Sequence, residues 1–482
     1  MKQVSGLLLA SCVCVLVLSC HKKDSSSSSG NNNTTPTEED LLKDSVYLYT
    51  KEVYLWQDVI PSYDQFNPRQ YTGLTELEAA QNVMNGIRKL QPLDRFSFVT
   101  TNAQSTGLQT GQNVDYGFFI KAASIDKVAP LDSIYWYVTY SYSQSTSGQA
   151  GVQRGWYISK INGTPIGYDQ PSVDLLNNVF FGTATTASFE FTKPDGTVTT
   201  ASLSKTSFTA NSVLYKTVID DGGKKVGYMV FNQFFGQPSR DELAQTFNYF
   251  QVQNIDELVV DLRYNPGGSV QTEDTLSNLI APLAANNQTM YKYIFNQTLQ
   301  NNQHQLIRKK LGYGDIFSTA ANTITFAKAG TLNLPRVFFI VTKGTASASE
   351  LLINNLRPYM DVKLIGDTTY GKPVGFFPIP IFNYDIYPIS FKTVNSAGNA
   401  DYYTGFAPDK LAADGVNTSW GDISEPSLAA ALHYISTGSF GRFEAESLNL
   451  QNLQLKGMNE TKGVNHALNE NKFSGMFIER KK

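Results

Sequence analysis

From residue 225 onward, the sequence alternates short buried strands with amphipathic helices, and this alternation limits the possible folds more than any other feature. Because strands that are joined through helices run parallel, we expect a mostly parallel or mixed sheet with helices packed on it. A capping box formed by Ser239 and Glu242 is predicted to begin the first helix. The predicted strands are Val226–Phe231, Glu257–Leu262, Val337–Thr342 and Val362–Ile365, and the predicted helices are Ser239–Phe250, Thr272–Leu283 and Ser347–Leu356.

The remaining segments have different patterns and divide the chain further. Residues 38–100 have helical periodicity, and Thr75 and Glu78 predict the start of a second helix. This segment is interpreted as a helical N-terminal domain or, alternatively, as a helical entry into the next domain. The predicted organisation continues with a β-rich domain (101–207), a core (208–436) with an Asn/Gln-rich insertion at 284–335, and a C-terminal tail (437–482) whose basic end, Glu479–Lys482, is expected to be solvated.

The three cysteines, Cys12, Cys14 and Cys20, all lie in the first twenty residues, so the folded part has no internal disulfide and no cysteine-based metal site. The apolar run Leu7–Leu18 would span about 18 Å as a helix, which is too short for a hydrocarbon core of about 30 Å. We therefore predict a signal peptide at 1–19. Its end, Val17–Cys20, resembles a bacterial lipobox, which implies lipidation of Cys20; an ordinary signal peptide that contains a cysteine is the alternative.

The polar segment 20–37 is predicted to be a flexible tether between this anchor and the globular part. The expected location is therefore the bacterial cell envelope, on the outer membrane, with the globular part on the periplasmic or surface side. Lys and Arg number 39 and Asp and Glu number 42, which gives a net charge of −3. Such a balance argues against a nucleic-acid partner, because a surface that binds phosphates must be basic.

Three short strings combine the residue types of a catalytic site. They are Asp261–Gly268 (DLRYNPGG), Gly344–Glu350 (GTASASE) and Gly366–Lys372 (GDTTYGK). Each follows a predicted buried strand, at the edge of the sheet where α/β folds place their sites. The double glycine would leave backbone N–H groups accessible, and the small residues of the second string would expose a serine hydroxyl at a helix start.

A serine nucleophile needs a base, and the four histidines, His21, His304, His433 and His466, are poorly placed to supply it. A lysine can act instead when burial lowers its pKa from about 10.4 toward neutrality. Lys372, which lies between Gly371 and Pro373 after a buried strand, suits that role.

The three strings resemble those of the C-terminal processing (tail-specific) Ser/Lys peptidases, relatives of the tricorn protease core. In that family a Gly-Lys pair follows the nucleophile by twenty-five residues, and here the spacing from Ser347 to Lys372 is 25, which selects Ser347 over Ser349. The resemblance extends to Asp94–Ser97 and to Gly405–Asp409, and covers roughly residues 40–436. It implies a βα-layered core of the crotonase-like or ClpP-like type within a mixed α/β fold.

The resemblance also implies roles for individual residues. Ser347 would attack the peptide carbonyl and Lys372 would accept its proton, whereas Glu350, Asp261 and Arg263 would be structural. The backbone N–H groups of Ala348 and of Gly268, or its neighbour Gly267, would bind the oxyanion. Many family members have a glutamine four residues after the lysine, but this chain has Phe376 there.

A second resemblance lies in the β-rich domain. The block Ala150–Gly163 is similar to a PDZ segment, and four residues stand where a PDZ domain binds a peptide carboxylate. These residues are Tyr116, Gly117, Phe118 and Phe119.

The predicted protein is thus an envelope-anchored serine endopeptidase that cleaves unfolded or C-terminally exposed polypeptides through an acyl-enzyme, with no cofactor and no metal. The alternative is an inactive relative that binds extended peptides or a surface polymer. Two other patterns are set aside. Gly366–Lys372 lacks the Ser/Thr of a phosphate-binding loop after its lysine, and Ser202 and Lys205 would face opposite sides of a strand.

Overall fold

The computed structural model describes residues 35–123, 134–441 and 475–479. Its main sheet has the strand order β10-β11-β12-β16-β17-β22. From β11 to β22 all neighbours are parallel, and β10 joins the edge antiparallel to β11. The alternation from residue 225 thus forms the expected sheet. The strands are β10 (Val213–Asp221), β11 (Lys224–Phe231), β12 (Glu257–Asp261), β16 (Arg336–Val341), β17 (Asp361–Gly366) and β22 (Lys410–Leu411).

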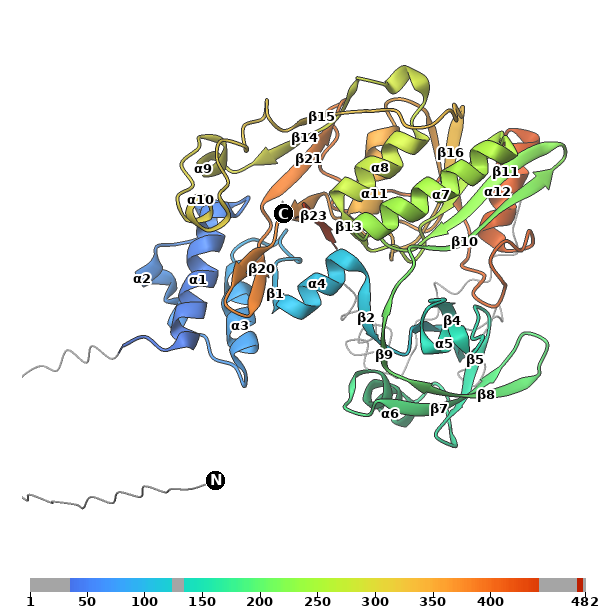
Figure 1. The fold of residues 1–482 in the computed structure, drawn as a ribbon, viewed down its shortest axis with the longest axis horizontal. Helices are drawn as coiled ribbons and strands as arrows, with labels where there is room; N and C mark the ends of the chain where they lie inside the picture. Colours follow the sequence, from blue (N-terminus) through green and yellow to red (C-terminus); the bar gives the residue numbers. More distant parts are fainter. Residues whose placement is uncertain (1–34, 124–133, 442–474, 480–482) are drawn as a thin grey trace, which may run out of the picture. The chain divides into compact units, whose positions relative to one another are not determined.

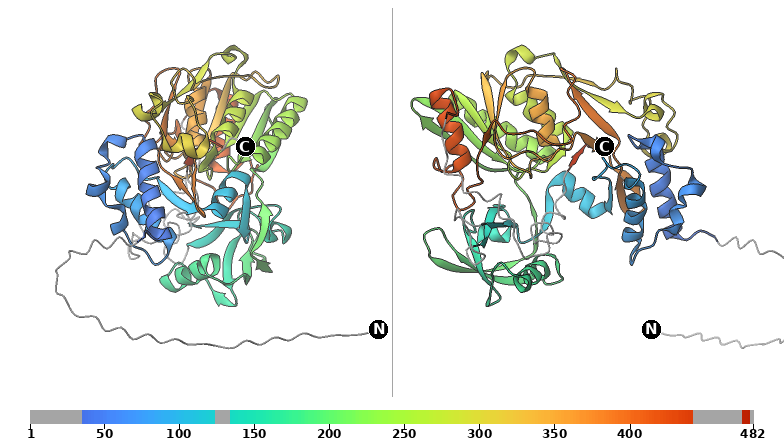
Figure 2. Two further views of the ribbon diagram at one scale, coloured as in Figure 1. Left: turned by 60° about the vertical axis from the view of Figure 1, so that its left-hand side comes forward. Right: turned by 180° about the vertical axis from the view of Figure 1, so that it is seen from behind.

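Helices cover both faces of this sheet (Figures 1 and 2). Helices α7 (Gln237–Gln253), α8 (Val270–Ile280) and α11 (Ala348–Leu356) pack on one face, and α12 (Pro426–Thr437) packs on the other. Successive strand residues point to opposite faces, so Val260 lies in the cluster with α7 while Val259 lies in the cluster with α12. Both faces are buried, which is why these strands are continuous apolar runs.

The predicted capping box of α7 is wrong. The helix begins two residues before Ser239, with Gly236 as its N-cap. The Glu242 carboxylate instead accepts hydrogen bonds from the backbone N–H groups of Ser212 (3.1 Å) and Val213 (2.8 Å). Glu242 thus satisfies two backbone donors at the start of β10, a segment distant in sequence, instead of capping its own helix.

The helical segment at the N-terminal side contains α1 (Glu38–Val53), α2 (Tyr63–Phe66) and α3 (Glu76–Arg88). Thr75 caps α3 as predicted, and its side chain accepts the N–H of Glu78 at 3.2 Å. Apolar side chains of α1 and α3 share one buried cluster with those of α7 and α8, and residues 38–482 form one compact unit. The N-terminal helical segment therefore packs directly against the core. Its last strand, β1 (Phe98–Thr101), pairs with β20 (Tyr384–Tyr387), which pairs with β19 (Ile379–Ile381).

The β-rich segment has its own sheet, in the order β3-β4-β5-β7-β8, and its own buried cluster. Helix α4 (Asn102–Thr110) leads into it, and a two-stranded pair, β2 with β9, flanks it. Its elements are β2 (Gln112–Asp115), β3 (Phe118–Ala123), β4 (Tyr135–Ser141), α5 (Thr146–Gln149), β5 (Tyr157–Ile161), β6 (Thr164–Pro165), α6 (Gln170–Phe181), β7 (Thr186–Thr192), β8 (Val198–Ser204) and β9 (Thr206–Thr209).

A second core sheet has the order β13-β23-β18-β21-β14-β15. Segment 284–335 supplies β14 and β15, so its strands are part of this sheet rather than a separate unit. None of the helices in the described ranges is long and apolar enough to cross a membrane. The elements are β13 (Gly267–Ser269), β14 (Thr289–Phe295), α9 (Gln297–Gln300), α10 (Leu306–Leu311), β15 (Thr323–Thr325), β18 (Val374–Phe376), β21 (Phe391–Asn395) and β23 (Gly475–Phe477).

A buried charge network ties the end of β12 to the rest of the core. The Arg263 guanidinium binds the carboxylates of Asp261 (2.7 Å), Asp414 (2.9 Å) and Glu425 (2.7 Å). Burial opposes the charge of Asp414, but the nearby cations, Arg154 among them, hold the pKa of that carboxyl well below its usual range. The predicted structural role of Asp261 and Arg263 thus agrees with the contacts that they make.

Arg263→Met is expected to lower the free energy of unfolding by about 3–5 kcal/mol, because it leaves buried carboxylates without their counter-ion. The control is Arg69→Met, whose ion pair with Asp44 (2.6 Å) is exposed and should be worth less than about 1 kcal/mol. Urea denaturation of both variants measures the difference. Equal losses would contradict a special role for the buried network.

Candidate active site

The three strings lie together at the carboxyl ends of parallel strands, as the sequence predicted. They follow β12, β16 and β17, which are neighbours in the main sheet. Backbone hydrogen bonds join the strings: Ala346 N–H donates to the Asn265 carbonyl (3.0 Å), and Tyr370 N–H donates to the Thr345 carbonyl (3.0 Å). The sheet edge therefore brings Ser347, the double glycine and the lysine segment into one site.

Ser347 occupies the turn between β16 and α11 in an unusual conformation. Its φ of 61° and ψ of −107° lie in a region that L-residues other than glycine rarely adopt, and such strain is concentrated at functional sites. The side chain is fully buried, and its Oγ has no hydrogen-bond partner among the described residues. A buried hydroxyl without a partner is costly, so this geometry is unlike that of a structural serine.

Ser349 has the contrasting geometry. Its Oγ donates to the Asn265 carbonyl at 3.2 Å, which satisfies the hydroxyl and ties the start of α11 to the double-glycine string. The spacing argument had selected Ser347 over Ser349, and the hydrogen bonding of the two side chains agrees with that choice.

The Glu350 carboxylate connects the serine turn to the lysine segment. Its Oε2 accepts the backbone N–H groups of Ser347 (2.9 Å) and Lys372 (2.8 Å). Its Oε1 accepts the Gly371 N–H (2.7 Å) and the Thr369 hydroxyl (2.6 Å). Burial raises the pKa of Glu350, and these four hydrogen bonds oppose that shift. One side chain thus fixes the backbones of both Ser347 and Lys372.

The Lys372 amine lies in an apolar environment. Its Nζ is 4.3 Å from the ring centre of Phe376 and 4.6 Å from that of Phe96, and the side chain is fully buried. Burial lowers the pKa of Lys372 well below its usual range, although the nearby Asp94 and Glu350 act in the opposite direction. A lysine in such surroundings can be neutral and accept a proton.

The two glycines differ in what their N–H groups do. Gly267 N–H donates to the Asn265 side-chain oxygen (2.9 Å), so it is already engaged. Gly268 has a φ of 140°, and a Cβ there would lie 2.0 Å from the Phe234 carbonyl oxygen, so no other residue fits. An ideal Cβ on Gly267 would lie 3.0 Å from Ala348 N, which places this loop against the first N–H of α11.

Two contributors were not singled out from the sequence. Asn265 orients the glycine loop through its side chain, which also donates to the Phe231 carbonyl (2.9 Å). Asp94 accepts the N–H groups of Phe96 and Ser97 (2.9 Å each) and so holds the Phe96 ring over the lysine. The strings DLRYNPGG and DRFS contained both residues, but local sequence does not reveal such partners.

The other candidate residues lie elsewhere. His304 is buried against Phe317, with Nε2 at 3.0 Å from the Tyr313 carbonyl, and His433 lies on α12. Tyr116 and Phe118 are buried in the cluster of the β-rich segment, around Gly117, and the Phe119 ring stacks on Tyr140. Cys20 lies outside the described residues.

A strained serine at the turn from a buried strand into a helix, a glycine loop and a buried lysine thus come together at one edge of the main sheet. Residues 225–409, which contain all three strings, match the model of peptidase family S41. This part of the chain is therefore similar to that family, and the resemblance to C-terminal processing peptidases is confirmed.

Curated relatives are similar over part of the chain. A carboxyl-terminal-processing protease of Picosynechococcus sp. is 28% identical over 36% of this chain and 36% of its own length. One from Synechocystis sp. is 31% identical over 32% of this chain and 30% of its own length. The matches thus span about a third of these relatives. A crystal structure described as an S41 protease of Bacteroides fragilis shares the fold, with a TM-score of 0.61, 22% identity and coverage of 82% of this chain and 97% of that one.

Proposed function

We propose that this protein is a serine endopeptidase that works with Ser347 and Lys372. The observation that carries the proposal is the Glu350 carboxylate, which binds the backbone N–H groups of both residues at once. The strained backbone and unpartnered hydroxyl of Ser347 support it, as does the lowered pKa of Lys372.

The reaction would proceed through an acyl-enzyme. Ser347 Oγ attacks the peptide carbonyl carbon while the neutral Lys372 amine takes the hydroxyl proton, and the resulting ammonium then gives that proton to the departing amine. Water, deprotonated by the same amine, hydrolyses the ester and restores the serine. The low polarity around Lys372 favours the neutral amine at the start of each step.

The oxyanion of the tetrahedral intermediate would be bound by the N–H groups of Ala348 and Gly268. Ala348 is the first residue of α11, where the helix supplies no carbonyl partner and its dipole favours negative charge. Gly268 is preferred over Gly267 because Gly267 N–H already donates to Asn265. Removal of one such donor typically raises the barrier by about 3 kcal/mol.

Phe376 replaces the glutamine that many relatives use to orient the lysine amine. Its ring and that of Phe96 lie on the amine and exclude water from it, so burial performs the pKa adjustment in this chain. A Lys372 amine oriented toward Ser347 would make the protein a peptidase. An amine that is not so oriented would leave the alternative, a relative that binds extended polypeptides without cleaving them.

Polypeptides with accessible C-terminal segments are the proposed substrates. Strand β3 lies at the edge of its sheet and α6 packs beside it through Phe180, so an extended chain could add to that edge in the manner of a PDZ ligand. Because Tyr116 and Phe118 are buried, backbone groups at Gly117–Phe119 would bind the carboxylate. The proposed anchor is a lipid on Cys20, which would hold the enzyme in the bacterial envelope.

An aryl sulfonyl fluoride tests the proposal directly. We expect it to label Ser347, as mapped by peptide mass spectrometry, and to stop cleavage of an unfolded reporter with a free C-terminus. The same reporter with a folded domain fused to its C-terminus should be cleaved more slowly. A folded protein that is not labelled and does not cleave, but binds the reporter, would favour the binding alternative.

A further inference from the structure

The C-terminal strand β23 lies between β13, which contains the double glycine, and β18, which follows Lys372. It pairs in parallel with β13 (Figure 1), where Gly267, Gly268 and Ser269 face Gly475, Met476 and Phe477. It also pairs in parallel with β18, which begins two residues after Lys372. Gly475 N–H donates to the Pro266 carbonyl (3.1 Å), and Ile478 N–H donates to the Phe376 carbonyl (3.1 Å). Residues 475–477, which lie in the segment predicted to be a C-terminal tail, are thus buried in the core, whereas Glu479 at the predicted solvated end is partly exposed.

This strand lies against the proposed oxyanion donors. The Gly475 carbonyl oxygen is 2.7 Å from the position of a Cβ on Gly267, and Ala348 N is 3.0 Å from the same position. The carbonyl of Gly267 and the N–H of Ser269 both bond to Phe234, on the other side of β13. Since backbone groups alternate along a strand, those of Gly268 face β23. With β23 in place, Ser347 and Lys372 have no exposed surface.

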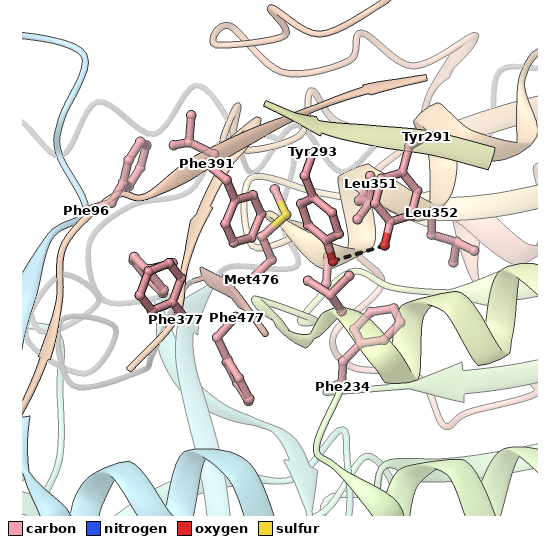
Figure 3. Close-up of a cluster of buried hydrophobic side chains, with 14 of the residues drawn as sticks. Phe96, Phe234, Tyr291, Tyr293, Leu351, Leu352, Phe377, Phe391, Met476 and Phe477 are labelled. Carbon is pink, nitrogen blue, oxygen red and sulfur yellow. Dashed lines mark hydrogen bonds between the residues drawn. The ribbon is translucent and has the colours of Figure 1, made fainter. Parts of the chain in front are cut away.

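The neighbouring residues form fitted pockets for the side chains of β23. Met476 is fully buried beside Phe391 and Tyr293, and Phe477 is buried on the other side of the strand (Figure 3). Gly375 makes room for Met476, because a Cβ at that position would lie 2.6 Å from Met476 Cγ and 2.4 Å from Phe391 Cζ. The strand that fills the slot is a glycine followed by two large apolar residues, all three of them buried.

A charged contact holds the outer end of the strand. The Glu479 carboxylate pairs with Arg240 and accepts the hydroxyl of Ser269, and Glu479 N–H donates to the Gln271 side-chain oxygen (3.0 Å). The Arg240 and Glu479 side chains are both partly exposed, so this contact is screened by water and can open more easily than the buried pockets.

The two strands that line the slot are also held by pairings that do not involve β23. On the sides that face away from β23, β13 forms a bridge to Phe234, and β18 pairs antiparallel with β21. We propose that the slot between β13 and β18 is a binding site for an extended polypeptide strand of the type Gly–apolar–apolar, and that residues 475–479 occupy it as an internal competitor that closes the site. This inference rests on the proposed peptidase function.

Met476→Asp in the full chain tests the proposal, because a carboxylate cannot remain in this apolar pocket. We expect sulfonyl fluoride labelling of Ser347 and reporter cleavage to increase at least tenfold. Val252→Asp, which changes an exposed apolar residue on α7, should leave both rates unchanged. A Met476→Asp protein that stays folded by circular dichroism but reacts more slowly would overturn the proposal, since β23 would then be a structural part of the site.

A charge exchange provides a second test that leaves the pockets intact. Glu479→Arg should repel Arg240 and increase labelling severalfold, and the double variant Arg240→Glu with Glu479→Arg should restore the slow rate. A strand with only a structural role would give no increase in labelling from Glu479→Arg, and that result would contradict the proposal even if Met476→Asp failed to fold.

Peptide binding separates the failure of this inference from the failure of the proposed function. A fluorescent peptide with the sequence of residues 473–482 should bind the Met476→Asp, Ser347→Ala protein, as measured by anisotropy, and should slow labelling of the Met476→Asp protein. The same peptide with Met476→Asp should not bind. Peptide binding without any labelling or cleavage would leave the slot in place but refute the peptidase, whereas absence of peptide binding would refute the slot. Because a tethered strand acts at an effective concentration of about millimolar, the free peptide should be tested up to that range.

Discussion

Ser347→Ala is expected to lower kcat for reporter cleavage by about 10⁴- to 10⁶-fold, because no other group can form the acyl-enzyme. The Ser347 hydroxyl has no hydrogen-bond partner among the described residues, so its removal should leave the thermal unfolding temperature nearly unchanged. Loss of activity without loss of stability is the signature of a nucleophile, and it is measured by initial rates and a thermal melt of the same preparation.

Ser349→Ala is the matched control for this prediction. Ser349 is equally buried, in the first turn of the helix that Ser347 precedes, but its hydroxyl donates to the Asn265 carbonyl. The control should lose about 1 kcal/mol of stability, the usual contribution of one hydrogen bond, and keep activity within a few-fold of wild type. If Ser347→Ala kept a tenth of the activity, or if Ser349→Ala lost as much, the assignment of the nucleophile would be wrong.

Lys372→Met is expected to lower kcat by about 10²- to 10⁴-fold, the usual contribution of a general base, and to stabilise the protein at neutral pH. Methionine fills a similar volume between Phe96 and Phe376 without an amine that must be kept uncharged. Activity lost together with stability gained would show that the lysine is retained for chemistry rather than for folding.

The pH dependence follows from the direction of the pKa shift. Burial lowers the pKa of Lys372 in the folded state, so between that value and the ordinary lysine pKa the unfolded chain binds more protons. Wild-type stability should therefore rise with pH across this window, and Lys372→Met should lose that rise. The neutral amine is the base, so the wild-type rate should also rise with pH, with a midpoint below the ordinary lysine range.

Lys328→Met is the control for the lysine prediction. Burial lowers the pKa of Lys328 to about 8, and its amine donates to the Leu279 carbonyl (2.8 Å), on segments that carry none of the three strings. This variant should alter the pH dependence of stability but leave the rate of cleavage unchanged. If Lys328→Met lowered the rate as much as Lys372→Met, the loss of rate would follow from changed stability and not from removal of the base.

The local sequence predicted the elements and the site because each left a pattern within a few residues. Apolar runs of strand length gave β11, β12, β16 and β17, and the fully buried sheet explains why these runs are uninterrupted. Parallel strands place their carboxyl ends at one edge, so the three strings had to meet there. The spacing from Ser347 to Lys372 selected the serine through a family resemblance, which residues 225–409 then confirmed.

Contacts between distant segments could not be predicted in this way. The capping box of α7 was wrong because Glu242 binds β10, and the segment predicted to be a C-terminal tail contributes Met476 and Phe477 to the core sheet. In both cases a local pattern competed with a partner that lies far away in the sequence. A capping motif or a polar tail describes a segment by itself, whereas buried N–H groups and apolar pockets select the partner that fits best.

The sequence by itself therefore determined the type of sheet and the edge that carries the candidate site, because periodicity is a local property, and the family resemblance proposed Ser347 and Lys372. Only the tertiary structure decided how these residues are held. The Glu350 carboxylate links Ser347 to Lys372, the Asn265 side chain accepts the N–H of Gly267, and Gly268 pairs with Met476 of β23. The tertiary structure also placed residues 475–479 beside the double glycine, since burial of two large apolar side chains stabilises a pairing between segments about two hundred residues apart.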